Sequence, residues 1–488
     1  MNLILVSKMR NSQTPMADKF FDNVKKAAKT IRENVEKGAF IQVISHLDAD
    51  GLVSAGVIGK MLLRLDAEFR IQVVKQIDES LVEELSSESP LTIFSDLGSG
   101  YLDLLKEKLS DRVIILDHHQ PIKVPAKNFV HVNPHLQGFD GSKEISGAGV
   151  AYLTAKAVDK SNVDLACTAV VGALGDLQDI DKKRKLFGLN DIIVNDAVEA
   201  GYLKVDSDMI FYGRETRPIH KALAYTTNPF MPGLSGEEDK CLGFLLNLGV
   251  KIKRNDRWIT LSDLSVKEKQ KLFSGIVKFL ATKGFLSDPS LNLVGAVYTL
   301  TNEDRWTPLR DAREFSSLLN ACGRMDKAGL GVSICMGARG KALDEALEIL
   351  KLYRQSIAKG INWLLETPGA IQERDNIYII SGKVIDEKMI SPITSILATT
   401  RVLKTSKPIV AFAHASNGTV KVSGRAASSL VESGVNLGTI FQEASEKLSG
   451  RGGGHDVAAG AQIPSGNEGE FAELVEELVK GKLGKNVK

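Results

Sequence analysis

Short apolar runs alternate with stretches of helical periodicity from Phe40 to about Ala200. The apolar runs cover residues 41–44, 91–94, 113–116 and 170–174, with a further strand expected near residues 72–77. Helical spacing covers residues 52–65, between the first run and that further strand. Because strands that alternate with helices build a mostly parallel sheet with helices on both faces, we predict an α/β domain over residues 36–212.

Four of the apolar runs end abruptly in side chains that can bind a metal. These side chains are His46, Asp48 and Asp50 after the first run, Asp96 after the second, Asp117, His118 and His119 after the third, and Asp176 after the fourth. In open α/β sheets, ligands collect outside the carboxyl ends of the strands. We therefore expect these residues to share one site at that edge of the sheet.

The rest of the chain divides into further segments. Residues 213–368 have a mixed pattern, predicted as a mixed α/β insertion, and end in a helical stretch, 341–366, that stops before Pro368-Gly369. A second, smaller α/β domain is expected over 369–470, with strands at 377–380, 409–413 and 419–423. The ends are predicted as an N-terminal extension and helix at 1–35 and a basic, frayed tail at 471–488.

Composition narrows the class of protein. The chain has 488 residues, which is more than a single hydrophobic core usually serves, because domains average ~150 residues. Its contents of 43% hydrophobic and 25% charged residues are typical of globular proteins. A net charge of +2 argues against a uniformly basic nucleic-acid surface, so any basic patch must be local. No apolar run approaches the ~20 residues that span a bilayer, so we predict a cytoplasmic protein with no membrane partner.

The chain has four cysteines, and they are widely spaced. No pair has the CxxC spacing of a zinc site or redox motif, and the scatter fits reduced thiols better than a disulfide framework. We assign them no role. The cysteines are Cys167, Cys241, Cys322 and Cys335.

Carboxylates and imidazoles are the expected ligands of Mn²⁺ or Mg²⁺, and the imidazoles favour Mn²⁺. Two such ions about 3.5 to 4 Å apart can activate a water and stabilise an in-line displacement at phosphorus. Each motif has a simpler explanation, because an Asp before a helix is often a cap and Asp-Ala-Asp-Gly is often a turn. Their joint occurrence at four predicted strand ends favours a metal site.

The ordered set HxDxDG, SDLG, DHH and GALGD resembles motifs I to IV of the DHH phosphoesterase superfamily. Ser423-Gly424-Arg425 and the later Gly-Gly-Gly-His resemble the companion DHHA1 domain of that superfamily. The resemblance covers residues 36–210 and 370–466. Within the superfamily, the length and the middle segment look most like the archaeal RecJ-like single-strand exonucleases, relatives of Cdc45.

The resemblance implies a role for each motif residue. Asp48, Asp50, Asp96, His118 and Asp176 would bind metal, with Asp96 as the candidate bridge between two ions. His46 would also bind metal, although its spacing to the acidic pair differs among branches of the superfamily. His119 would steady or protonate the scissile phosphate, and Asp117 would orient a neighbouring histidine. The implied cofactor is a pair of Mn²⁺ ions, with Mg²⁺ or Co²⁺ as substitutes.

The second domain is predicted to bind substrate. Successive glycines let backbone N–H groups approach a phosphate, which suits Gly452, Gly453 and Gly454 with the adjacent His455. Arg425 is a second candidate phosphate contact. A cleft between the metal domain and this DHHA1 domain would hold the end of a single strand, which implies exonuclease action.

Three functions stay open at this point. The first is a metal-dependent exonuclease on single-stranded DNA, RNA or both, in DNA replication or repair. The second is a nanoRNase, oligoribonuclease or dinucleotide phosphodiesterase, and the third is a Cdc45-like replication scaffold. Every acidic and imidazole position of the four motifs is retained, which favours an active enzyme. The resemblance suggests single-stranded nucleic acid as partner, and the replication complex GINS as a partner of the middle segment.

Overall fold

The computed structural model describes residues 15–88, 91–109, 112–123, 129–179, 181, 183–226, 231, 233–282, 293–382, 384–399, 403–415 and 418–483. The predicted extension at 1–14 and the last residues of the predicted tail, 484–488, lie outside them. The chain forms two compact units. The first holds residues up to 350 except 224–241 and 278–286, and the second holds those two segments and the residues from 351 onward.

The first unit contains a five-stranded sheet of order β2-β1-β3-β4-β5, in which every neighbouring pair is parallel. The strands are β1 (Ile41–His46), β2 (Phe69–Val74), β3 (Leu91–Ser95), β4 (Val113–Leu116) and β5 (Val130–Val132). The predicted parallel sheet is therefore confirmed. The strand expected near 72–77 is displaced to β2, which begins at 69, and β5 was not predicted.

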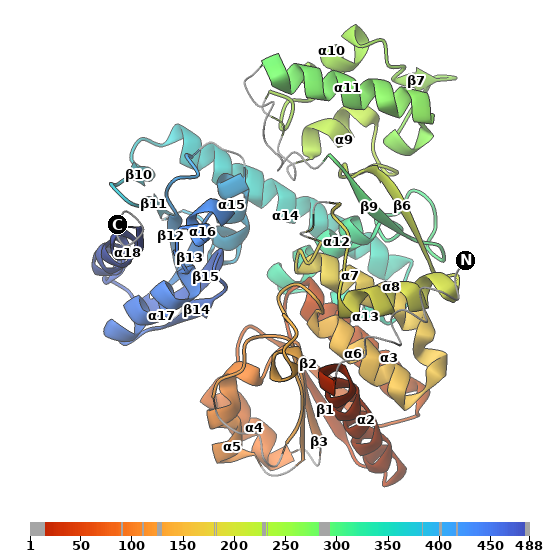
Figure 1. The fold of residues 1–488 in the computed structure, drawn as a ribbon, viewed down its shortest axis with the longest axis vertical. Coiled ribbons are helices and arrows are strands. Elements are labelled where there is room, and N and C mark those ends of the chain that lie inside the picture. Colours follow the sequence, from red (N-terminus) through yellow and green to blue (C-terminus); the bar gives the residue numbers. More distant parts are fainter. Residues whose placement is uncertain are drawn as a thin grey trace. The chain divides into compact units, whose positions relative to one another are not determined.

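Helices cover both faces of this sheet (Figure 1). One face carries α4 (Glu79–Glu88) and α5 (Leu102–Lys108), and the other carries α2 (Pro15–Glu36), α3 (Ala49–Arg64) and α6 (Gly147–Val158). Ile44, Phe94 and Ile115 lie in register across the strands and pack in one apolar cluster with α4 and α5. Side chains alternate along a strand, so the neighbouring row of Val43, Ile93 and Ile114 packs on the opposite face.

The predicted strand at 170–174 is wrong. These residues belong to a helix, α7 (Ala166–Gly175), which packs against α3, α6, α8 (Leu189–Glu199) and α12 (Ala312–Arg324). A helix enclosed on several sides is apolar around its circumference and has no amphipathic period, so a short window of it resembles a buried strand. Asp176 therefore follows a helix and not a strand.

The middle of the chain is a mixed α/β region, as predicted. Its other elements are β6 (Leu203–Met209), α9 (Ile219–Tyr225), α10 (Glu238–Asn247), β7 (Lys253–Arg254), β8 (Arg257–Trp258), α11 (Val266–Thr282), β9 (Val294–Leu300) and α13 (Ala328–Cys335). Strands β6 and β9 pair antiparallel, and β7 and β8 form a hairpin. Helix α12 packs against α3 and α7, and α13 packs against α3 and α12, so the end of this region belongs to the core around the first sheet.

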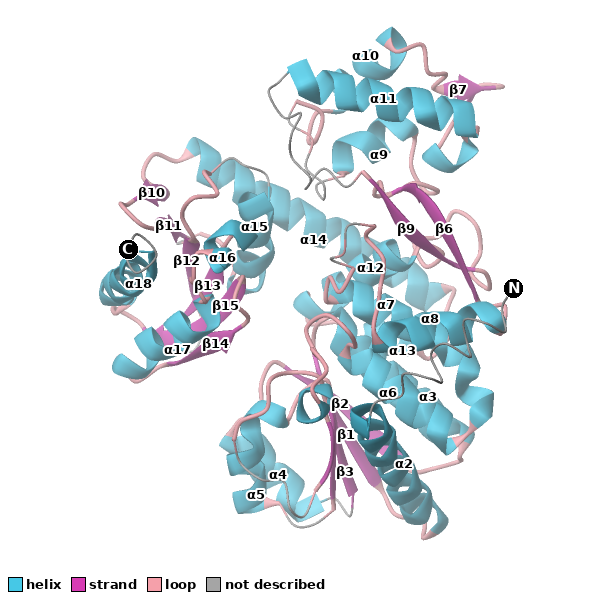
Figure 2. Cartoon of the chain, viewed as in Figure 1, coloured by secondary structure: helices cyan, strands magenta, loops and turns pink. Residues whose placement is uncertain are grey.

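The long helix predicted at 341–366 is present as α14 (Lys341–Glu366). The second unit contains a six-stranded sheet of order β10-β11-β12-β13-β15-β14 (Figure 2), in which only β11 and β12 are parallel. Its strands are β10 (Ile371–Glu373), β11 (Tyr378–Ser381), β12 (Ile409–His414), β13 (Thr419–Arg425), β14 (Arg451–Gly454) and β15 (Ala458–Pro464). Its helices are α15 (Glu387–Thr399), α16 (Ser428–Glu432), α17 (Leu437–Lys447) and α18 (Glu468–Leu483).

The prediction of a frayed tail from residue 471 is wrong for residues 471–483, which lie in α18. Phe471, Val475 and Val479 of this helix are fully buried, and the Phe471 ring lies 5.3 Å from that of Phe441. Charged residues lie between these apolar positions, so the segment is polar on average although its apolar residues have helical spacing.

The four cysteines are buried and form no disulfide. In the described part of the chain, no helix combines the length and the apolar character that crossing a membrane requires.

Candidate metal centre

Three of the predicted polar clusters meet at the carboxyl edge of the first sheet. His46 is the last residue of β1, Asp96 follows β3, and the Asp117-His118-His119 segment follows β4. Because these strands are adjacent and parallel, their ends bring the side chains together. Asp176 reaches the same place from the end of α7, which it caps.

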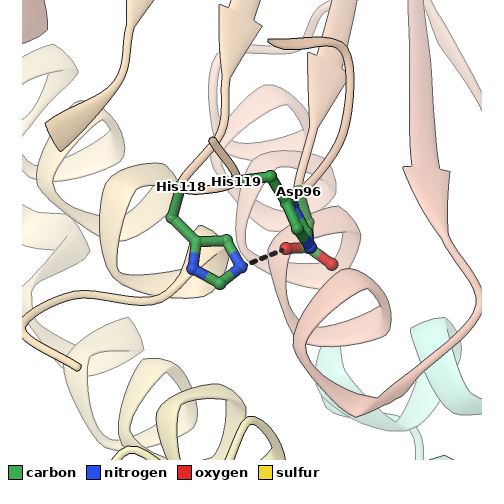
Figure 3. Close-up of side chains that lie close together, drawn as sticks. All are labelled: Asp96, His118 and His119. Carbon is green, nitrogen blue, oxygen red and sulfur yellow. Dashed lines mark ion pairs between the residues drawn. The ribbon is translucent and has the colours of Figure 1, made fainter. Parts of the chain in front are cut away.

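His118 lies at the centre of the cluster, and Figure 3 shows its ring facing the Asp96 carboxylate. Its Nε2 atom is 3.1 Å from Asp176 Oδ2, 3.2 Å from Asp96 Oδ1 and 3.7 Å from Asp50 Oδ2. All of these side chains except Asp176 are almost completely buried. Three carboxylates therefore converge on one imidazole nitrogen.

A second set of donor atoms surrounds Asp96 on its other side. His46 Nδ1 is 2.8 Å from Asp48 Oδ2 and 3.9 Å from Asp96 Oδ2. Three groups of potential ligands each have donor atoms within 4.8 Å of one another: Asp96, His118 and His119; His46, Asp48 and Asp96; and Asp50, His118 and Asp176. Asp96 and His118 are each shared by two groups, so the geometry suits more than one cation.

Several atoms of this cluster are buried without a hydrogen bond of acceptable geometry. They are both carboxylate oxygens of Asp96, Nε2 of His118 and Nδ1 of His46. An unpaired buried polar atom is costly, and such atoms in a folded protein call for an ion or another partner. A divalent cation among these atoms would satisfy them, and the mixture of carboxylates and imidazoles fits Mn²⁺.

The electrostatics of the cluster point the same way. Burial, together with the Asp50 carboxylate, raises the pKa of Asp96 well above its usual value. Burial and the Asp176 carboxylate raise the pKa of Asp50 to about 6. Burial lowers the pKa of His118, but Asp176 and Asp96 outweigh it and raise the pKa overall. A site that crowds this many carboxylates together is stabilised by added positive charge.

Helix termini hold the two carboxylates of the first motif. Asp48 is the N-cap of α3, and its Oδ1 accepts a hydrogen bond from Gly51 N at 3.0 Å. Asp50 accepts hydrogen bonds from Gly147 N at 2.6 Å and Ala148 N at 3.0 Å, at the start of α6. The simpler explanation of Asp48 as a cap is therefore correct, and its other oxygen still faces His46.

Asp117 supports the neighbouring backbone and His119. Its Oδ1 accepts hydrogen bonds from His118 N at 2.8 Å and from His119 Nδ1 at 2.8 Å, and its Oδ2 accepts one from Ser99 N at 2.9 Å. Burial raises the pKa of Asp117, but the adjacent His119 outweighs it and lowers the pKa overall. Within the described residues Asp117 belongs to none of the ligand groups but contacts His119, and the orienting role that the resemblance implies stays a prediction.

A hydrogen-bond relay fixes the ring of His118. Its Nδ1 donates to the Gly141 carbonyl oxygen at 2.7 Å, which leaves Nε2 facing the carboxylates. Gln178 Nε2 donates to the same oxygen at 2.9 Å, and Asn190 Nδ2 donates to Gln178 Oε1 at 2.8 Å. No motif or spacing in the sequence singled out Gln178 or Asn190.

Helix α12 adds residues that the sequence analysis missed. Asn320 Oδ1 accepts a hydrogen bond from Ala49 N at 3.0 Å, beside the first motif. A Cβ on Gly323 would lie 1.6 Å from the Leu47 carbonyl oxygen, so only glycine allows this close approach. Burial lowers the pKa of His46, but the Asp48 carboxylate outweighs it and raises the pKa overall; the Arg324 guanidinium contributes in the lowering direction at both His46 and Asp48, so it lies within electrostatic reach of them. Their sequence distance from the four motifs concealed them.

The predicted substrate-binding residues gather at one end of the second sheet. Arg425 pairs with Ala458 on β15, and Gly454 pairs with the adjacent Ala459. The glycines lie in the edge strand β14 and not in a loop, and exposed His455 follows them.

The three glycines of β14 differ in their surroundings. A Cβ on Gly452 would lie 2.7 Å from the Phe441 carbonyl oxygen, and Gly454 has a φ of +139°. A Cβ on Gly453 would meet no atom within 4 Å. Packing and backbone conformation therefore explain Gly452 and Gly454, and Gly453 alone lies beside open space.

Two family models match the chain. A model described as the DHH-CID domain matches residues 211–294, and one described as the DHHA1 domain matches residues 376–481. The first match covers β7, β8 and the helices around them, and the second covers most of the second sheet and α18. The helix at 468–483 is thus part of a recognised domain.

One similar protein matches most of the chain, and another matches part of it. An uncharacterized protein of Methanocaldococcus jannaschii is 33% identical over 470 residues, 94% of this chain and 98% of that protein. The single-stranded-DNA-specific exonuclease RecJ of Thermus thermophilus is 28% identical over 197 residues, which cover 38% of this chain and 28% of RecJ.

Two solved structures have the same fold. A crystal structure of RecJ in complex with Mn²⁺ from Thermus thermophilus has a TM-score of 0.58 at 18% identity, over 94% of this chain and 55% of that chain. Cdc45 from Entamoeba histolytica has a TM-score of 0.63 at 13% identity, over 94% of this chain and 99% of that chain.

Proposed function

Because the chain belongs to the DHH phosphoesterase superfamily, with a C-terminal DHHA1 domain, we propose that it is a divalent-metal-dependent phosphodiesterase. The substrate we propose is single-stranded DNA, RNA or both, hydrolysed from one end during DNA replication or repair. The curated relative from Thermus thermophilus carries the name of such an exonuclease, although the match covers 28% of its length.

One observation carries this proposal: the unsatisfied, buried Asp96 carboxylate at the junction of two ligand groups. A carboxylate in this position is suited to touch two cations at once. The proposed ligands are Asp96 with His46, Asp48, Asp50, His118 and Asp176. When bound, two Mn²⁺ or Mg²⁺ ions would activate a water and neutralise charge on the scissile phosphate.

The chain's own residues would position the phosphate and move the proton. Asp117 holds His119 through Nδ1, and one His119 ring nitrogen lies within 4.8 Å of donor atoms of Asp96 and His118. His119 would donate a hydrogen bond or a proton to the phosphate next to the metal centre. Arg324 would add positive charge there.

The DHHA1 domain would bind another part of the strand. Arg425 Nε donates to Ser395 Oγ at 2.8 Å, and its Nη1 donates to the Gly424 carbonyl oxygen at 2.7 Å. These two hydrogen bonds fix the guanidinium at the end of β13. We propose that Arg425, Gly453 and His455 contact phosphate, with Gly452 and Gly454 setting the shape of β14.

The replication complex GINS is a further proposed partner, for residues 213–368. This proposal rests on the resemblance to the RecJ-like branch and to Cdc45, and co-purification with purified GINS would test it.

Cleavage of end-labelled single strands tests the enzymatic proposal. DNA and RNA of several lengths, including dinucleotides, would be incubated with Mn²⁺, Mg²⁺ or a chelator. Asp176→Ala would be compared with Asp191→Ala, because the two side chains are 25% and 26% exposed and Asp191 instead pairs with Lys185. We expect Asp176→Ala to lower the rate on the order of a thousandfold, because metal-centre interactions contribute several kcal/mol.

The possible outcomes separate the alternatives. Metal-dependent shortening of long strands from one end supports the exonuclease and gives its polarity. Activity on dinucleotides that collapses on long strands indicates a small-substrate phosphodiesterase. No cleavage of any substrate by a folded protein that binds Mn²⁺ would contradict the proposed enzyme and favour a scaffold.

A further inference from the structure

Two of the chain's three tryptophans are exposed by more than a third, and a cation lies over the ring of each of these two. Trp258 of β8 is 38% exposed, Lys253 Nζ lies 4.7 Å from its ring centroid, and the His220 ring packs against it at a centroid distance of 4.7 Å. Trp306, in the loop after β9, is 46% exposed, and Arg257 Cζ lies 4.1 Å from its ring centroid. We call Trp258, Trp306, Lys253 and Arg257 the tryptophan platform.

The β7–β8 hairpin presents these side chains on both of its faces. Lys253 and Trp258 are directly opposite each other in the ladder, so they share one face. Arg257 precedes Trp258 and therefore points to the other face, where it meets Trp306. The turn residues Asn255 and Asp256 both have positive φ, as a tight two-residue hairpin turn requires.

Trp306 has a backbone conformation that packing does not explain. Its φ is +71°, which is uncommon for a large side chain, and nearly half of the residue is exposed. The loop is held firmly, since Arg310 Nη1 donates to the Glu303 carbonyl oxygen at 2.7 Å and Arg339 forms an ion pair with Glu303. Strained positions held this way are concentrated at functional sites.

The platform lies in a locally basic segment. Residues 251–258 contain four cations and one carboxylate, a net charge of +3, while the whole chain carries +2. Arg254 is neutralised by Glu268, at 2.9 Å. Among the residues that the structure describes, no carboxylate lies within ion-pair distance of Lys253 or Arg257. Their charges remain available to an anionic ligand.

We propose that the tryptophan platform binds single-stranded nucleic acid, with bases stacked on Trp258 and Trp306 and phosphates contacting Lys253 and Arg257. Aromatic rings interleaved with cations are the typical surface for single strands, because every base has a face that can stack. The proposal rests on the proposed function and adds to it a binding surface outside the metal centre. It predicts that long strands bind more tightly than dinucleotides.

Binding of labelled single strands to the full-length Asp176→Ala protein tests the platform without cleavage. The probes are fluorescein-labelled oligothymidylate and oligouridylate, with affinity measured by anisotropy. We expect Trp306→Ala and Trp258→Ala each to weaken binding about tenfold, and Trp306→Phe to retain most of it. Phe273→Ala is the matched control, since Phe273 is also 38% exposed and lies on α11 of the same matched domain.

A second measurement separates stacking from loss of fold. In the otherwise wild-type protein, Trp306→Ala should leave dinucleotide hydrolysis and Tm unchanged while lowering kcat/KM on long strands. Lys253→Ala with Arg257→Ala should reduce the slope of affinity against salt concentration.

Unchanged binding of long strands by the folded Trp258→Ala, Trp306→Ala double variant would overturn the platform. If that variant instead loses capture of a protein partner, the surface is a protein-docking site and the proposal is likewise wrong. Failure of the proposed function would look different. In that case the wild-type protein would cleave no substrate, but the tryptophan substitutions would still weaken its binding of single strands.

Discussion

Gln178 Nε2 lies 2.9 Å from the Gly141 carbonyl oxygen, the same oxygen that accepts the hydrogen bond of His118 Nδ1. The two donors fix the position of this carbonyl, and the carbonyl fixes the ring of His118. Because Nδ1 donates to this carbonyl oxygen, Nε2 is the nitrogen that faces the carboxylate cluster and would bind a cation. The side chain of Gln178 is fully buried, so water cannot replace it.

Gln178→Leu should therefore weaken Mn²⁺ binding about 10- to 100-fold, the usual effect of removing a group that orients a metal-binding histidine. Calorimetric titration with Mn²⁺ would measure it. Gln42→Leu is the control, since Gln42 is also a buried amide but bonds to Gln72 at the edge of the sheet. An equal loss of Mn²⁺ affinity in both variants would mean that general destabilisation, and not the relay, is responsible.

The sequence could predict the first sheet because its strands are short, apolar and bounded by polar residues. The ends of β1, β3 and β4 lie where the pattern indicated, so His46, Asp96 and His118 were correctly expected to come together. Asp176 was expected in the same cluster for the wrong reason. It reaches the cluster from a helix whose apolar circumference imitates a strand.

Other parts of the candidate site depend on contacts between distant segments. Asn320 bonds to Ala49 across 271 residues, and Gln178 bonds to Gly141 across 37. Such residues have no local pattern that distinguishes them from ordinary polar residues of a helix or loop. The same holds for α18, whose burial depends on the sheet against which Phe471 packs.

Arg324→Ala should raise KM for single strands about tenfold and should not weaken Mn²⁺ binding. The guanidinium disfavours additional positive charge near His46 and Asp48, so its removal should slightly strengthen Mn²⁺ binding. The substrate phosphate would lose its contact with the guanidinium. Steady-state kinetics and Mn²⁺ titration together would measure both effects. Lys327→Ala is the control, because Lys327 is an exposed cation three residues away that pairs with Glu345. A large loss of Mn²⁺ affinity in Arg324→Ala would contradict this role.

Gly453→Ala should leave Tm unchanged and weaken substrate binding. A Cβ at this position meets no atom of the chain within 4 Å, so only a ligand could be displaced. Gly452→Ala should instead lower Tm, since its Cβ would lie 2.7 Å from both the Phe441 carbonyl oxygen and Ser445 Oγ. Thermal unfolding and KM would be measured for both variants. Normal KM in Gly453→Ala would argue against phosphate binding along β14.

Glu314→Gln should stabilise the protein increasingly as pH rises. Burial and the Asp311 carboxylate raise the pKa of Glu314 to about 8, so the folded state holds a proton that the unfolded state loses near its usual value. Folding stability due to Glu314 is present at low pH and falls as pH rises toward 8. The variant removes this dependence while its amide oxygen can still accept the hydrogen bond of Thr216.

The gain from Glu314→Gln should be below about 1 kcal/mol at about pH 5 and on the order of 4 kcal/mol at about pH 8. Thermal unfolding across this range would measure it, with Glu199→Gln at an exposed position of α8 as the control. A gain that is the same at all pH values would show that packing, and not ionisation, causes the difference in stability between the variant and the wild type.

Asp96→Asn should change the protein's stability in opposite directions with and without metal. In a chelator the variant should melt at a higher temperature than the wild type, because the buried Asp96 carboxylate has no hydrogen bond and lies beside Asp50. In saturating Mn²⁺ the order should reverse. A ligand that binds only the folded state adds about 2.7 kcal/mol at 100 times its Kd, and the wild type alone would gain this in full. Asp103→Asn, at an exposed position of α5, should behave as the wild type in both conditions. If Asp96→Asn instead melted at a lower temperature in the chelator as well, its carboxylate would be stabilising the metal-free fold, and the metal centre would have to be assigned to other residues.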